Sequence, residues 1–332
     1  MVDYSNVISV GCAVITLIFI GFIARKFRII KSYAFDRINT FIFKPCFVPL
    51  IANNVVYQDL SKIDFRPFGA CALAIISTHV FLLFVLIFKN ENRLAYYLST
   101  TLPSTYVNYV IIGIPIFDSI WDASENQILT VITLCNDLIA APIYLILSGI
   151  NTYLSNNREH VKKGEPKEKF SFKIILNIII GIIKNPIIIG YIIGFFWAGV
   201  GIPTCYFIDR LIIIMSQCVL ALSCFCVGSF LADHSLLSCS WVQFIICAVS
   251  RHIIMPLLTG LFSSALGLSG RQSRQAIVIT TLPTAVASYL LSYNANIGTG
   301  ASSTMIFWTN IFFIPIIIAW FAVLDALGIF IE

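Results

Sequence analysis

Residues 100–109 read TTLPSTYVNY, and residues 280–289 read TTLPTAVASY. The string TTLP is thus repeated at an offset of 180 residues (280 − 100), and Tyr109 and Tyr289 recur at the same offset. Both copies lie in long apolar stretches, and the proline of each copy removes a backbone N–H that a helix uses. The pair predicts two broken helices at corresponding places in two halves of the chain.

The composition places these stretches in a membrane. Of 332 residues, 58% are hydrophobic and 11% are charged, and the mean hydropathy is +0.91. A soluble domain carries about a quarter charged residues, and a water-soluble monomer could not bury so much apolar surface. Intrinsic disorder and nucleic-acid binding are excluded as the main role. The ten cysteines form no CxxC pair and lie mostly in apolar runs, so we expect buried thiols, no metal site and no cofactor.

Ten apolar runs are long enough to cross a bilayer, which requires about 20 residues per helix. They cover residues 7–24, 40–57, 66–88, 94–117, 127–149, 186–203, 208–232, 240–265, 274–293 and 300–325. The longest polar stretch separates five runs from five. We therefore expect an all-α integral membrane protein with a first five-helix repeat at 1–150, a charged loop at 151–173 and a second repeat at 174–332.

The distribution of basic residues predicts the orientation. Fourteen of the 21 Lys and Arg residues fall on the side of the loop 151–173, and five fall on the opposite side. The positive-inside rule makes this loop cytoplasmic and places both termini across the membrane. We expect this membrane to be the plasma membrane or the endoplasmic reticulum. Arg25 and Lys26 follow the first apolar run and do not precede it, so this run is a retained helix and not a signal peptide.

An odd number of spans per half means that the second half enters the membrane from the opposite side. Such inverted repeats are typical of secondary transporters, whose binding site lies where the repeats meet. Pro103 and Pro283 would break spans four and nine, and half-helix N-termini meeting at the midplane would favour an anion. Asn108, Tyr109, Ser288 and Tyr289 would supply polar or aromatic contacts.

Asp137 and Arg251 are charged side chains within predicted spans, where each costs about 2.5–3.5 kcal/mol on insertion scales. Asp137 follows Asn136 within TVITLCNDLIAAPIYLIL (130–147) in span five. It is a candidate for a cation or proton site, or a structural carboxylate paired with a donor. Arg251 in span eight is its cationic counterpart, either as an ion-pair partner or acting on a bound anion. The sequence leaves these alternatives open.

Four stretches resemble the auxin efflux carrier family, which includes the PIN-formed and PIN-likes carriers of plants. They are STYVNYVIIGIPIF (104–117), KNPIIIGYIIGFFWAGVGIP (184–203), LALSCFCVGSFLA (220–232), and SRHIIMP (250–256) leading to TTLPTAVASYLL (280–291). They occur in the order of the family and span nearly the whole chain. The resemblance implies a crossed-helix bundle shared with bile-acid/sodium symporters and sodium/proton antiporters. Spans 1, 2, 6 and 7 would form a scaffold, the other spans would move as an elevator, and the protein would form a homodimer.

The resemblance also implies site residues, with two departures. Plant carriers commonly have Leu-Pro-Asn in span four, whereas Ser104 follows Pro103 here, so the break lies either at Pro103 or one turn later near Asn108. In span nine Thr284 follows Pro283, where plant carriers differ. The family's second span faces the substrate path, which adds Asn53 and Asn54 to the candidate substrate contacts.

The combined prediction is a secondary transporter, not an enzyme, that moves a small organic anion across a lipid bilayer by elevator-type alternating access. The four histidines are scattered, and the chain has no Walker A string and no His-rich metal motif. The alternative is a sodium- or proton-coupled antiporter or symporter that uses Asn136 and Asp137. A passive channel is not excluded, whereas a seven-helix receptor would not produce a five-plus-five repeat.

Overall fold

The structure is a computed structural model that describes residues 4–56, 60, 63–87, 92–122, 125, 127–163, 176, 179–181, 183–201, 203 and 205–330. The described residues are helical apart from turns and one isolated bridge between Val107 and Thr284. The helices are α1 (Tyr4–Lys26), α2 (Ser32–Phe41), α3 (Phe47–Val56), α4 (Arg66–Phe81), α5 (Arg93–Thr105), α6 (Ile114–Ile120), α7 (Gln127–Cys135), α8 (Ala141–Lys163), α10 (Pro186–Val200), α11 (Tyr206–Asp233), α12 (Trp241–Val249), α13 (Met255–Ala265), α14 (Gly270–Thr280), α15 (Val286–Ala295) and α16 (Thr299–Leu327). The all-α prediction is confirmed.

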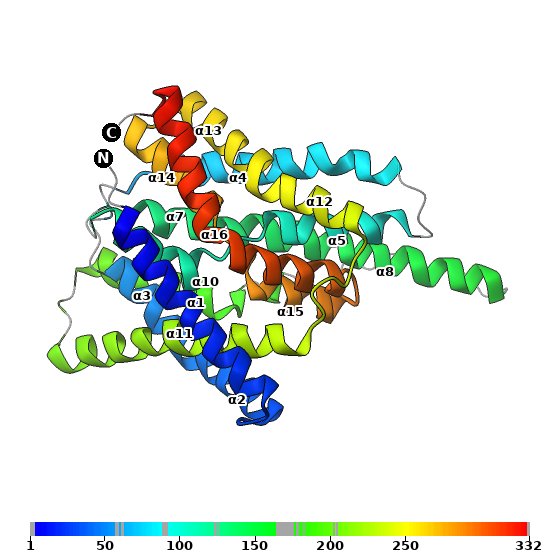
Figure 1. Ribbon diagram of the computed structural model, residues 1–332, viewed down its shortest axis with the longest axis horizontal. Helices are drawn as coiled ribbons and strands as arrows, with labels where there is room; N and C mark the ends of the chain where they lie inside the picture. The colour runs from blue at the N-terminus through cyan, green and yellow to red at the C-terminus, as the bar shows by residue number, and fades with distance from the viewer. Residues whose placement is uncertain are drawn as a thin grey trace.

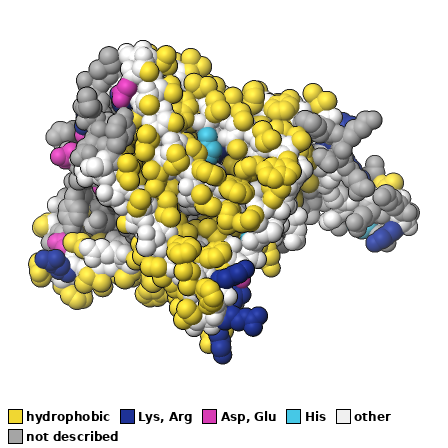
Figure 2. All heavy atoms as spheres, in the orientation of Figure 1, with side chains coloured by type: hydrophobic (Ala, Val, Ile, Leu, Met, Phe, Trp, Pro, Cys, Tyr) yellow, Lys and Arg dark blue, Asp and Glu magenta, His cyan; other side chains and the backbone are white. Residues whose placement is uncertain are grey.

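Six stretches of the described chain are helices long and apolar enough to cross a membrane. They are Ser5–Lys26, Arg66–Ile87, Gln127–Arg158, Tyr206–Asp233, Trp241–Ala265 and Thr299–Leu327. Hydrophobic side chains cover most of the middle of the face shown in Figure 2, and Lys and Arg side chains gather towards its edges. This is the surface expected of a protein whose middle section is surrounded by the hydrocarbon core of a bilayer.

The other four predicted spans are interrupted or short, which explains why length and composition identify six. Residues 94–117 and 274–293 are each broken in the middle, so neither is one continuous helix. Residues 40–57 pass through α2, a π-helical turn at Ile42–Cys46 that contains Pro45, and α3. The run predicted at 186–203 forms α10, which begins at Pro186; the Asn185 side chain caps it by accepting a hydrogen bond from the N–H of Ile187 at 2.9 Å.

α8 differs from expectation at its C-terminal end. The helix continues to Lys163 and so includes the first part of the predicted charged loop 151–173. Residues 151–163 contain no glycine or proline, the first being Gly164 and Pro166, and Leu154, Arg158 and Lys163 are residue types that favour helix. Figure 1 shows α8 extending away from the bundle. Residues 164–173, the rest of that loop, lie outside the described residues.

Glycine contacts hold two helix pairs close together. α1 packs on α11, and α10 packs on α3. A Cβ atom on Gly228 of α11 would overlap the carbonyl oxygen of Ile18 in α1, and one on Gly194 of α10 would lie 2.8 Å from the Cβ atom of Val55. Only glycine permits these backbone approaches, which are typical of helix packing in membranes.

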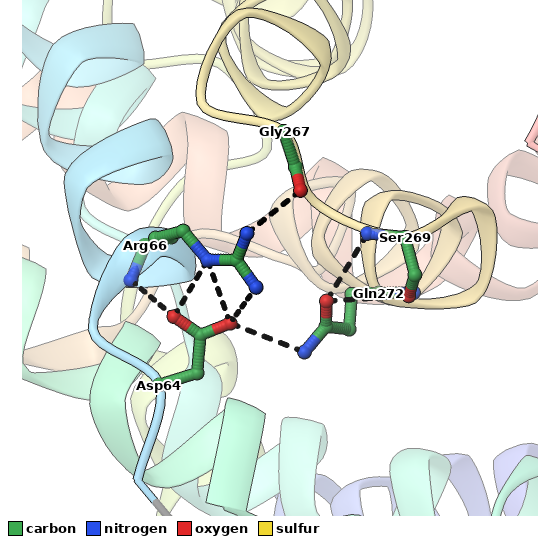
Figure 3. Close-up of polar contacts among 5 residues, drawn as sticks. All are labelled: Asp64, Arg66, Gly267, Ser269 and Gln272. Atoms are coloured by element: carbon green, nitrogen blue, oxygen red, sulfur yellow. Dashed lines mark hydrogen bonds and ion pairs between the residues drawn. The ribbon is translucent and has the colours of Figure 1, made fainter.

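Polar contacts join α4 to the connection between α13 and α14 at one end of the bundle (Figure 3). The Arg66 guanidinium binds both carboxylate oxygens of Asp64, and its Nη1 donates to the carbonyl oxygen of Gly267 at 2.8 Å. Gln272 Nε2 donates to Asp64 at 3.3 Å, while Gln272 and Ser269 form a capping box at the start of α14. These contacts link one helix of the first half to two of the second.

Candidate functional site

Two broken helical stretches cross where their backbones are unwound. α5 ends at Thr105, and the chain is helical again from Tyr109; α14 ends at Thr280, and α15 begins at Val286. The N–H of Asn108 donates to the carbonyl oxygen of Pro283 at 2.8 Å, and the N–H of Ala285 donates to that of Tyr106 at 3.1 Å. The two unwound segments thus satisfy part of each other's backbone, as non-helical chain at membrane depth requires.

The crossing fixes the register of the first break. Pro103 lies inside α5, and the helix ends two residues later, so the break has the Asn108 register and not that of Pro103. Pro283 lies within its own break. Val107 and Thr284, which face each other across the crossing, are 177 residues apart (284 − 107). This separation is three residues shorter than the 180-residue offset of the TTLP strings. The first break therefore lies about one helical turn later, relative to its TTLP string, than the second break does.

Asn136 satisfies the peptide groups of Val107 at the first break. Its Oδ1 accepts from the Val107 N–H at 3.2 Å, and its Nδ2 donates to the Val107 carbonyl oxygen at 2.6 Å. Asn136 begins a π-helical turn, Asn136–Ala140, between α7 and α8. At the second break the hydroxyl of Thr309 in α16 accepts from the N–H of Thr284 at 3.0 Å. Each break is therefore supported by the last helical stretch of its own half.

Arg251 joins the C-terminal ends of the two helices that precede the breaks. Its side chain is fully buried in a π-helical turn, Ser250–Ile254. Nε and Nη2 donate to the carbonyl oxygen of Leu282, and Nη1 donates to that of Ser104 at 3.4 Å. A cation favours the carbonyl end of a helix. Among the described residues no ion pair forms between Arg251 and Asp137, so the structure does not have the ion-pair arrangement, one of the two alternatives for Arg251.

A cavity of about 410 Å³ lies beside the crossing. Its wall includes the residues that begin the helices after both breaks, 107–111 and 285–287, but none of residues 100–105 or 280–283 that lead into the breaks. The remaining wall comes from α2, α3, α7, the α7–α8 turn, α10, α11 and the later part of α15. The lining polar or ionisable side chains of these elements include Asp36, Asn39, Thr133, Asn136, Asp137, Ser223, Ser229, Asp233 and His234.

One side of the cavity is an aromatic cluster made by α11 and α15. The rings of Phe230 and His234 are stacked at 4.0 Å, and Tyr289 meets both edge-on at 4.6 and 4.8 Å. Tyr293 stacks on Tyr289 at 6.1 Å. His234 Nδ1 lies 2.8 Å from the carbonyl oxygen of Phe230, which leaves Nε2 as the other polar atom of the ring. The cluster supplies a flat apolar surface with polar edges.

Asp137 is a buried residue of the cavity wall. Its Oδ1 accepts hydrogen bonds from the Tyr106 hydroxyl at 3.2 Å and from Asn185 Nδ2 at 2.9 Å. At the exposed end of the cavity, Asp233 forms an ion pair with Arg25 at 2.8 Å. Among the described residues that line the cavity, none is Lys or Arg.

The structure brings together part of the predicted site. Five predicted residues line the cavity: Asn108, Tyr109, Asn136, Asp137 and Tyr289. Pro103, Ser104, Pro283 and Thr284 belong to the crossing through backbone contacts, and the buried Ser288 bonds to the carbonyl oxygen of Ala285. Asn53 and Asn54 lie in α3 outside the lining, and the side chain of Asn54 is outside the described part.

Sequence reasoning missed the contribution of α2 and α11. Asp36 and Asn39 come from a short helix with little apolar signal, and Phe230 and His234 lie at the end of an ordinary apolar span. Phe230 and His234 gain their place in the cluster only through tertiary contact with Tyr289. The pair Asp233-His234 was one available signal, because two titratable side chains follow each other where span seven ends.

Comparison with known proteins gives a consistent result. The family model described as "Membrane transport protein" matches residues 8–321. Auxin efflux carrier component 8 of Arabidopsis thaliana is 24% identical over 256 residues, covering 67% of this chain and 69% of the plant protein. Probable auxin efflux carrier component 5b of Oryza sativa subsp. japonica is 19% identical over 244 residues, covering 67% of this chain and 66% of that protein. The chain thus matches about two thirds of the length of each.

Proposed function

The chain belongs to the membrane transport protein family that includes the auxin efflux carriers, and we propose that it carries a small organic anion, bound in the cavity beside the crossing. The cavity volume of about 410 Å³ falls in the range of small-molecule sites, roughly 300–1,000 Å³. The carboxylate of the substrate would lie at the crossing, and its apolar body would lie against Phe230 and Tyr289.

The observation that carries the proposal is the set of donors at the crossing. Residues 108–111 and 285–287 begin two helices and place the positive end of each helix dipole at the cavity. The N–H groups of Asn108, Ile111 and Ala285 already have acceptors within the crossing, so the dipoles act on the anion together with unpaired side-chain donors. Asn108 and Ser223 also line the cavity, and Asn108 Nδ2 and Ser223 Oγ are buried without a hydrogen-bond partner in the described part of the chain. Buried donors of this kind are ready to bind a carboxylate.

The packing pattern supports a ten-helix, five-plus-five inverted repeat. If spans one and six correspond, and spans two and seven correspond, exchange of the halves turns the α1–α11 contact into the α10–α3 contact, and both are present. The supports of Val107 by Asn136 and of Thr284 by Thr309 exchange in the same way. In this proposal α1, α2, α3, α10 and α11 form the scaffold, and the other helices carry the crossing as an elevator.

The site then lies between the two parts that would move past each other. Phe230, His234, Asp36 and Asp233 are scaffold residues, whereas Asn108, Asp137 and Tyr289 are on the moving part. Displacement of the moving part would carry the crossing away from the scaffold wall and open the cavity on the other side, which is the geometry of alternating access.

The test is uptake of labelled indole-3-acetate and of malate by proteoliposomes, with protein-free vesicles as control. Saturable, protein-dependent uptake of either anion supports the proposal. Asn108→Ala is expected to lower the uptake rate at least about tenfold, since it removes a charge-assisted hydrogen bond worth about 1.5–3 kcal/mol. If neither anion moves and the protein instead dissipates a sodium or proton gradient, the coupled-antiporter alternative replaces it.

A further inference from the structure

Asp137 is a carboxylate without a cationic partner in the wall of the cavity. It is 4% exposed, and its two hydrogen-bond donors, Tyr106 and Asn185, are both uncharged. Within the described chain, no Lys or Arg forms an ion pair with it. Both bonds go to Oδ1, so Oδ2 is the oxygen that remains available to the cavity. A buried ionised carboxylate without a cation is costly.

The other ionisable groups near Asp137 do not supply a countercharge. Tyr106 at the break and Tyr191 on α10 interact with it electrostatically and are neutral phenols. Asp36, Asp233 and His234 line the exposed end, where Arg25 is already bound to Asp233. Arg251 directs its guanidinium to backbone carbonyls of the crossing instead.

The anion subsite and Asp137 share one small cavity. Tyr106, which donates to Asp137, and Asn108, which presents the buried donor, flank the same peptide, Val107. Asn136, the residue before Asp137, holds that peptide on both sides. A carboxylate bound at Asn108 and an ionised Asp137 would therefore repel each other at low dielectric, where like charges oppose joint ionisation.

We propose that Asp137 takes up one proton for each anion that the cavity binds, so that the protein is a proton–anion symporter. This inference rests on the proposed function. The proton leaves hydronium in solution, whose O–H bond breaks to give water, and forms an O–H bond at Asp137 Oδ2. The loaded cavity then has the same net charge as the empty one, and the translocated pair carries no charge.

The contact with Asn185 connects this proton to movement. Asn185 caps α10 of the scaffold through Oδ1 and donates to Asp137 through Nδ2, so one amide joins the scaffold to the part that would move. A hydrogen bond to an ionised carboxylate is about twice as strong as one between neutral groups. Proton uptake at Asp137 would weaken the hydrogen bond from Asn185. Anion binding would thereby loosen the contact between the scaffold and the helices that carry the crossing.

The experiment measures the charge that is moved. Proteoliposomes are loaded with wild type, Asp137→Asn or the control Asp209→Asn, whose carboxylate lies in the first turn of α11 outside the cavity lining. The probe is a labelled indole sulfonate, which stays ionised at every pH used and does not cross lipid as a neutral acid. Uptake is followed under a pH gradient alone and under a potassium–valinomycin potential alone.

Wild type and Asp209→Asn are expected to accumulate the sulfonate when the outside is acidic and to ignore the potential. Asp137→Asn is expected to respond to an inside-positive potential and to lose the response to pH, because its translocated complex carries the anion's charge. Wild-type uptake that follows potential and ignores the pH gradient overturns the coupling but leaves anion transport intact. A wild type that neither binds nor transports either the sulfonate or indole-3-acetate at any pH overturns the proposed function itself.

A binding measurement keeps the inference testable if Asp137→Asn does not fold. The affinity of purified wild type for the sulfonate is measured from pH 5.5 to 8. Uptake of one proton per anion predicts a loss of roughly tenfold per pH unit wherever Asp137 is ionised in the empty protein. An affinity that is constant over this range overturns the inference.

Discussion

The side chain of Asn136 replaces the helical hydrogen bonds that the backbone of Val107 lacks because the helix is broken there. Its amide has one acceptor and two donors, and it meets both the N–H and the carbonyl oxygen of Val107. An aspartate could accept but not donate, and a leucine could do neither. The residue type is therefore decided by the backbone of another segment, 29 positions earlier in the chain.

Asn136→Ala is expected to destabilise the protein by about 1–3 kcal/mol for each of the two buried backbone groups that lose their partner. The loss appears as a lower unfolding temperature of the detergent-solubilised protein. Asn39→Ala, which removes an amide from the partly exposed wall of the same cavity, serves as control and should change the temperature little. Equal effects of the two substitutions would contradict the role assigned to Asn136.

At the scale of elements, the sequence predicts where spans begin and break but not how they are distorted. Asn185-Pro186 identifies the start of α10, and Pro283 identifies the second break, because both are signals within a few residues of the chain. The first break occurs after Pro103 instead of at it, in a place that depends on support from Asn136. The π-helical turns that carry Asp137 and Arg251 have no local signal, although such turns often mark functional sites.

The close contact of α1 and α11 gives an element-scale prediction. Gly228→Ala places a methyl group against the backbone of Ile18, so the two helices must separate, which costs about 1–3 kcal/mol for an overpacked interface. Gly199→Ala is the matched control, since its Cβ atom would lie 3.6 Å from the nearest side-chain atom, Leu60 Cδ1. Thermal unfolding of both variants measures the difference. A Gly228→Ala protein as stable as Gly199→Ala would refute the packing.

For the molecule as a whole, the sequence locates half of the site. The repeat and the polar residues of spans four, five and nine predict the crossing together with Asn108, Asp137 and Tyr289. The remaining wall comes from α2, α3, α10 and α11, whose contribution arises only when these helices pack against the crossing. Phe230 lies in a span that contains no repeated polar motif, and His234 follows directly after it. No pattern in the sequence therefore connects these two residues with Tyr289, although their rings are in contact.

The ion pairs of Glu125 and Asp64 make the stability of the protein depend on pH in the acid range. The Arg271 guanidinium binds both carboxylate oxygens of Glu125 at 2.7 Å and, with help from Gln275, holds the pKa of Glu125 below its usual 4.5. A carboxylate with a lowered folded-state pKa stabilises the protein above the usual value, and this contribution is lost as pH falls through the lower one. Asp64 behaves in the same way, because its hydrogen bonds with Arg66 lower its pKa.

Glu125→Gln is therefore expected to lower the unfolding temperature at pH 7 and to converge on wild type as the pH falls below 4.5. Arg271→Gln removes the other partner and should give the same dependence on pH. The measurement is the unfolding temperature of all three proteins between pH 3 and pH 7. A difference between variant and wild type that stays constant across this range would contradict the assigned ion pair.

The central claim is that donors at the helix crossing bind the charged group of an organic anion. Asn108→Asp tests it most directly, because aspartate keeps the Oδ1 that accepts from the N–H of Ile111 and replaces the donor Nδ2 with a negatively charged oxygen. The measurement is equilibrium binding of labelled indole-3-acetate to purified wild type and variant at pH 7, with circular dichroism to show that both are folded. The account predicts at least a tenfold loss of affinity in the variant, equivalent to about 1.4 kcal/mol. A folded Asn108→Asp protein that binds the anion as tightly as wild type would contradict it.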